Sequence, residues 1–164
     1  MASLMCLAMA PAASARTAAI VKTAAPITID GRTDDWGYIT ATHGIRTPDG
    51  RPAASFRLAY DEQNLYALFE VVDESPLKNS ATVREELLKS GDAVGLALAA
   101  TKGPPRTQRI LVTRIDGEPV IMALRPEWPE QKPHTFTSPV KSVTMDYVGP
   151  VEGARAALRE VPGG

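Results

Sequence analysis

The stretch ASFRLAYDEQNLYALFEVV, residues 54–72, decides the fold class. From Ala54 to Tyr60 its large apolar residues alternate with small or polar ones, which is the pattern of a strand with one buried face. A polar turn follows at 61–64, and residues 65–72 are then mostly apolar on both faces, as in a central strand. The two runs therefore predict an antiparallel hairpin joined by a four-residue loop.

Short strands divided by turns continue along the rest of the chain. They are predicted at 27–29, 93–99, 109–115, 120–124, 140–145 and 154–161. Asp116-Gly117 is a hairpin signal because both residues tolerate a positive φ. Residues 81–89 predict a short helical turn at best, and the prolines of 125–139 predict a long irregular loop. We therefore expect an all-β fold, an antiparallel β-sandwich of jelly-roll type.

The N-terminal residues 1–15 read MASLMCLAMAPAASA and end in an A-x-A-like cleavage site. This apolar stretch is too short to span a bilayer. We expect a secretory signal peptide at 1–15, a spacer at 16–26 and the sandwich at 27–164, in a protein that is secreted, periplasmic or on the cell surface. The alternative is a disordered Ala-rich N-terminus, since no Lys or Arg precedes the apolar run.

The C-terminal residues Pro162-Gly163-Gly164 follow directly on a strand-like run. They predict the turn of a hairpin whose second strand is absent, so we expect a sandwich that is incomplete at its C-terminus. The alternative is an ordinary frayed terminus.

Charge and motifs argue against several classes of function. The net charge of −1 and the pI near 6.1 do not favour a nucleic-acid partner. One cysteine, Cys6 of the leader, and two distant histidines predict neither a disulfide nor a structural zinc site. No Gly-x-Ser-x-Gly or phosphate-loop motif occurs, and adjacent carboxylates such as Asp34-Asp35 would point to opposite faces of a strand. We expect no catalytic site in this chain.

Four short motifs occur in an order that carries a family resemblance. They are Ile29-Asp30-Gly31 with Asp34-Asp35-Trp36, Ala59-Tyr60-Asp61 with Asn64-Leu65-Tyr66, Val71-Val72-Asp73, and Gly91-Asp92-Ala93-Val94. This order and spacing resemble the family 9 carbohydrate-binding modules, closely over 27–99 and more loosely over 108–161. The resemblance implies a β-sandwich attached to a larger secreted glycan-active enzyme, with a polysaccharide or oligosaccharide ligand and a downstream catalytic domain. It also implies structural calcium bound by loop oxygens.

The sequence departs from the family at its sugar site. The family has a tryptophan shortly before the strand that Gly91-Asp92 opens, whereas residues 83–91 contain no aromatic residue. Gly95 stands where the family has a glutamate, and a second tryptophan would fall beyond Gly164. The resemblance therefore implies the fold but not sugar binding at the family's own site.

Trp128 is the candidate platform for a ligand. It lies in Arg125-Pro-Glu-Trp-Pro-Glu-Gln131, a polar segment stiffened by two prolines. A rigid aromatic flanked by Arg125, Glu127 and Gln131 provides both stacking and hydrogen bonding. The alternative is a tryptophan folded back over the sheet edge. The other tryptophan, Trp36, is expected in the core.

Asp73 and Asp92 are the candidate calcium ligands, with Glu74 nearby, because carboxylates next to strand ends supply hard oxygen atoms. The alternative is that both aspartates accept backbone N–H bonds in turns.

The function predicted from the sequence is a non-catalytic extracellular carbohydrate-binding or carbohydrate-associated module of a larger glycan-active protein. Three alternatives stay open: a ligand-free structural or adhesion sandwich, an appendage of a glycoside hydrolase, and a haem-binding sandwich of an electron-transfer protein. The last needs an axial pair such as Met and His. The residues available for it are Met122, Met145, His43 and His134.

Overall fold

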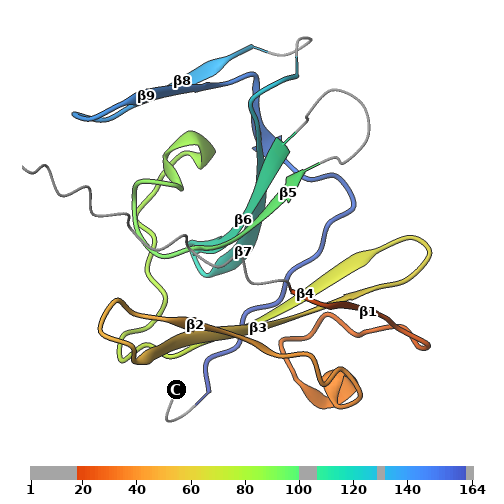
Figure 1. The fold of residues 1–164 in the computed structure, drawn as a ribbon. Helices are drawn as coiled ribbons and strands as arrows, with labels where there is room; N and C mark the ends of the chain where they lie inside the picture. The colour runs from red at the N-terminus through yellow and green to blue at the C-terminus, as the bar shows by residue number, and fades with distance from the viewer. Residues whose placement is uncertain (1–17, 100–106, 129–131, 162–164) are drawn as a thin grey trace, which may run out of the picture.

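The computed structural model describes residues 18–99, 107–128 and 132–161, and these residues form an all-β fold, as predicted (Figure 1). The strands are β1 (Ile20–Lys22), β2 (His43–Arg46), β3 (Pro52–Tyr60), β4 (Leu65–Val71), β5 (Val94–Ala99), β6 (Thr107–Ile115), β7 (Glu118–Arg125), β8 (His134–Thr137), β9 (Ser142–Met145) and β10 (Tyr147–Pro150). Two short 3-10 turns accompany them, η1 (Asp34–Trp36) and η2 (Arg84–Glu86).

The first sheet is built around β3. Strand β4 pairs with β3 on one side in the predicted antiparallel hairpin, with Tyr60 opposite Leu65 and Ala54 opposite Val71. Strands β2 (antiparallel) and β1 (parallel) also pair with β3. Strand β1 belongs to the segment that the sequence predicted as a spacer, and β2 was not predicted at all.

The turn of this hairpin is organised by one carboxylate. Asp61 accepts hydrogen bonds from the N–H groups of Gln63 (2.7 Å) and Asn64 (2.6 Å) and from the hydroxyl of Tyr66 (2.6 Å). These bonds, the one from Tyr66 first, favour the ionised form and lower the pKa of Asp61 from 3.8 to about 2. The polar turn is therefore an Asx-type turn held by a charged acceptor.

The second sheet is antiparallel, in the order β10-β7-β6-β5. Strands β6 and β7 meet at Asp116 (φ 51°) and Gly117 (φ 87°), which are the two positive φ angles that the predicted tight hairpin requires. Strands β8 and β9 form a separate two-stranded sheet. In Figure 1 the second sheet lies above the first. The η2 turn lies to the left of the second sheet, and the β8–β9 hairpin lies above it.

Each larger sheet has its own buried cluster. The first cluster consists of Ile27, Trp36, Ile39 and Ala59. The second consists of Ala81, Leu87, Leu111, Met122, Leu124 and Phe136. Trp36, with 3% of its surface exposed, is a core residue as predicted. Because the buried side chains form two clusters, a single apolar layer shared by both sheets, which defines a sandwich, stays a prediction.

Three local predictions were wrong. Residues 27–29 are not a strand, because the N–H of Thr28 donates to the Asp35 carboxylate (2.8 Å) instead of to a neighbouring strand. Residues 154–161 are also irregular: they run from the second sheet toward the first, where Arg159 lies against Gly31 (Figure 1). Conversely, the proline-rich stretch predicted as a loop contains strand β8, whose Phe136 is buried in the second cluster.

Replacing Trp36 with Ala is expected to lower the free energy of unfolding by about 3–5 kcal/mol, because it leaves a cavity in the first cluster. Urea unfolding followed by circular dichroism measures this change. Val140→Ala is the control, since Val140 is 94% exposed and its loss should change stability by less than about 0.5 kcal/mol. Equal unfolding midpoints for the two variants would contradict the assignment of Trp36 to the core.

The lowered pKa of Asp61 predicts that the stability of the fold depends on pH. Because the pKa of Asp61 is lower in the folded chain, its contribution to stability is present above pH 3.8 and is lost as the pH falls toward about 2. Asp61→Asn should therefore lower the urea midpoint near neutral pH and lose less stability than the unmodified chain between pH 3.8 and about 2. Parallel pH profiles for the two proteins would contradict this role.

Candidate functional site

The structure brings Arg125 and Trp128 together at one end of the second sheet. Arg125 ends β7 and lies opposite Tyr147 of β10. Its guanidinium carbon is 4.5 Å from the Trp128 ring centroid and 4.9 Å from the Tyr147 ring centroid. One cation thus interacts with two aromatic rings. These residues, with Gln108 and Asp146, are called the Arg125 cluster below.

Strand register assembles this cluster. Arg109 lies opposite Leu124, so Gln108 lies beside Arg125 one position further along the hairpin. The Nε of Arg125 donates a hydrogen bond to the side-chain oxygen of Gln108 at 3.1 Å. Gln108, Arg125 and Tyr147 therefore form a row across three adjacent strands and project from the same face of the sheet.

The other polar groups of the cluster bind to the protein itself. The backbone N–H of Trp128 donates to the Asp146 carboxylate at 2.8 Å, and this bond fixes the chain just after β7. The hydroxyl of Tyr147 donates to the carbonyl of Pro150 at 2.7 Å. The Tyr147 ring lies over Gly149, where an added Cβ would be only 2.8 Å from Cζ. An alanine at position 149 would therefore require the Tyr147 ring to shift.

The other predicted ligand residues are placed differently. Glu127 is exposed, Trp128 is half-buried rather than fully exposed, and Gln131 lies outside the described residues. The sequence did not single out Tyr147, Gln108 or Asp146. Finding these residues requires the register between strands that are distant in sequence, and the alternation of residues alone does not fix that register.

Asp73 and Asp92 bind different parts of the backbone: Asp73 bonds within its own turn, and Asp92 bonds to a distant segment. Asp73 accepts bonds from the N–H and hydroxyl of Ser75, both at 2.9 Å, and the backbone bond is the main cause of its lowered pKa. Asp92 accepts a bond from the N–H of Lys78 at 3.0 Å. Among the described residues, no three His, Cys, Asp or Glu side chains form a group that could hold a metal ion. Calcium at these aspartates stays a prediction.

The candidate haem ligands are also dispersed. Met122 is fully buried in the second cluster, and His43 accepts the N–H of Ala19 at 3.1 Å beside Phe56. His134 and Met145 are directly opposite each other on β8 and β9. Cross-strand neighbours project from the same face, so these two would approach a haem from one side rather than from both. The arrangement does not favour the electron-transfer alternative.

Gly95 lies close to a buried leucine of the adjacent strand. It lies opposite Leu111, and an added Cβ would be 2.9 Å from the Leu111 Cδ2 atom. A glutamate at this position would bring its charge toward the second cluster, which costs free energy unless the charge is paired.

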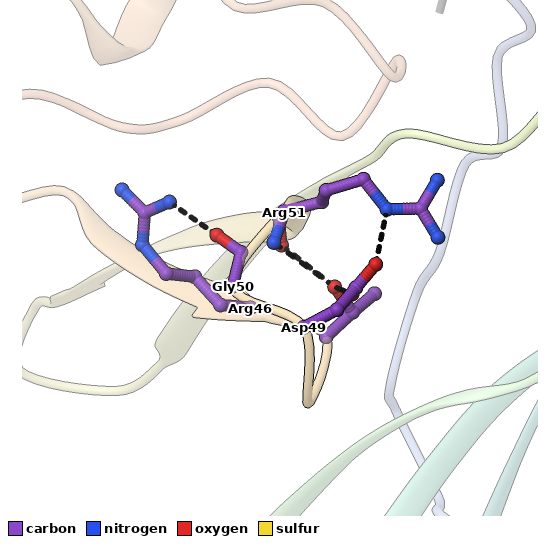
Figure 2. Close-up of polar contacts among 5 residues, drawn as sticks. Arg46, Asp49, Gly50 and Arg51 are labelled. Carbon is purple, nitrogen blue, oxygen red and sulfur yellow. Dashed lines mark hydrogen bonds and ion pairs between the residues drawn. The ribbon is translucent and has the colours of Figure 1, made fainter.

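The loop between β2 and β3 satisfies its own polar groups (Figure 2). The Nε of Arg51 donates to the Asp49 carboxylate and Nη1 of Arg46 donates to the carbonyl of Gly50, both at 2.7 Å. The bond from the hydroxyl of Thr47 is the main cause of the lowered pKa of Asp49. The two guanidinium groups point away from each other in Figure 2, so the loop does not form a cationic pocket.

Comparisons of the chain with protein-family models, curated proteins and solved structures found no match. Among the described residues, no helix is long and apolar enough to cross a membrane.

The close packing of Tyr147 on Gly149 can be tested with Gly149→Ala. The added methyl group must displace the ring and its bond to Pro150, so the free energy of unfolding should fall by about 1–3 kcal/mol. Gly44→Ala is the matched control, because an added Cβ at Gly44 meets no atom within 4 Å. Urea unfolding compares the two, and equal stabilities would contradict the described position of the ring.

Proposed function

We propose that this chain is a non-catalytic extracellular module that binds carbohydrate or accompanies a carbohydrate-active domain in a longer protein. The observation that carries the proposal is the Arg125 cluster, which combines two aromatic rings, a guanidinium and an amide at one end of the second sheet. We propose a polysaccharide or oligosaccharide as its ligand.

The chemistry of sugars supports this choice. A pyranose ring has an apolar C–H face that packs on an aromatic plane, and its hydroxyl groups need directional hydrogen-bond partners. Arg125, Trp128 and Tyr147 are each half-buried, so they are held by the sheet and still reach solvent. Binding sites of this kind combine apolar surface with a few placed polar groups.

A ligand-free structural or adhesion module is the second candidate, and the first sheet favours it. By strand register, one face of that sheet carries five large apolar residues that are 41–50% exposed, in addition to Phe56 and Phe69. The five are Ile20, Ile45, Tyr60, Leu65 and Val71. Contiguous apolar surface of this kind is typical of contact with another protein or domain.

Affinity electrophoresis in gels that contain soluble polysaccharides distinguishes the two candidates. Retention of the unmodified chain, and at least about a fivefold weaker affinity of Trp128→Ala, are expected if an aromatic contact worth about 1 kcal/mol is lost. Tyr60→Ala, an exposed aromatic substitution on the other sheet, should migrate like the unmodified chain. Absence of retention on every polysaccharide would contradict the carbohydrate proposal and leave the structural one.

A further inference from the structure

We infer that the Arg125 cluster binds a carboxylate, so that its ligand is an acidic saccharide of the uronate class; this inference rests on the proposed function. Among the described residues, three arginines are half-buried: Arg57, Arg114 and Arg125. Arg57 is paired with Glu70 at 3.5 Å, and Arg114 with Glu160 at 3.0 Å. Within the described residues, Arg125 has no carboxylate partner at all.

The hydrogen bonds of the cluster leave one edge of the guanidinium for a ligand. Nε of Arg125 donates to Gln108, and the described residues give its two terminal nitrogens no hydrogen bond. The carboxylate of Asp146 accepts the N–H of Trp128 and is not paired with Arg125. The terminal N–H groups are therefore the charged directional donors of the cluster that remain for a ligand, beside the neutral amide N–H groups of Gln108.

The guanidinium is also fixed in advance. Its bond to Gln108 and its contacts with the Trp128 and Tyr147 rings restrict the side chain before any ligand arrives. Little rotamer entropy is then lost on binding. Two parallel N–H groups in one plane match the two oxygens of a carboxylate, and this bidentate geometry distinguishes an acid from a neutral hydroxyl group.

The net charge of the chain bears on the specificity of the proposed contact between Arg125 and a carboxylate. The chain has a net charge of −1, so it does not attract polyanions in general. Preference for an acidic sugar must come from a local cation, and Arg125 provides one next to aromatic surface. A sulfate ester on a sugar shares the anionic chemistry, but its oxygens are arranged tetrahedrally, whereas the two oxygens of a carboxylate lie in one plane with the guanidinium.

The test uses one polymer in two charge states, polygalacturonate and the same polymer with its carboxyl groups methyl-esterified. In affinity gels the unmodified chain should be retained at least about tenfold more strongly by the acidic form, as expected for a charge-assisted contact. Arg125→Gln should lose that preference, and Arg125→Lys should keep only part of it because an ammonium cannot bind in a bidentate manner. Arg109→Gln is the matched control, an exposed arginine on the adjacent strand β6.

Each outcome decides the inference separately from the proposed function. Equal retention by both forms overturns the carboxylate inference and leaves carbohydrate binding intact. Stronger retention by a sulfated galactan than by polygalacturonate overturns it as well. No retention by any polymer, acidic or neutral, overturns both. Because the two forms are compared on the unmodified chain, the test does not depend on the folding of the Arg125 variants.

Discussion

The antiparallel register between β6 and β7 is the constraint on which the chemistry of this chain depends. Asp116 and Gly117 close that hairpin in two residues and so fix every pair beyond them. A shift of one residue would move each side chain to the other face of the sheet. In the observed register Leu124 points into the second cluster, whereas Arg125 projects from the opposite face beside Gln108.

The sequence could predict the features that are settled within one hairpin. Apolar patterning and turn chemistry were enough for β3, β4, β6 and β7, and the usual burial of large aromatic residues predicted the core position of Trp36. The site was predicted only in part. Arg125 and Trp128 belong to one short motif, but Tyr147 and Gln108 join them through strand pairings that depend on the packing of the whole sheet.

The remaining differences arise where a side chain competes with the backbone ladder. Residues 27–29 alternate like a strand, yet the Asp35 carboxylate accepts the N–H of Thr28. Asp73 and Asp92 have the chemistry of calcium ligands, and each also accepts a backbone N–H, from Ser75 two residues along the chain and from Lys78 in a distant segment respectively. The local pattern of polar residues does not show whether a backbone N–H will donate to a neighbouring strand or to a side-chain carboxylate.

The parallel strand β1 has a consequence for the order in which contacts can form. Each two-stranded hairpin closes a loop of only a few residues, whereas the pairing of Ile20 with Leu58 must first bring together distant parts of the chain. The entropy of loop closure rises with the logarithm of loop length, by about 0.6 kcal/mol per doubling. The strand that comes first in the described chain is thus among the costliest to bring into place, and its ladder depends on a β3–β4 ribbon that can form locally.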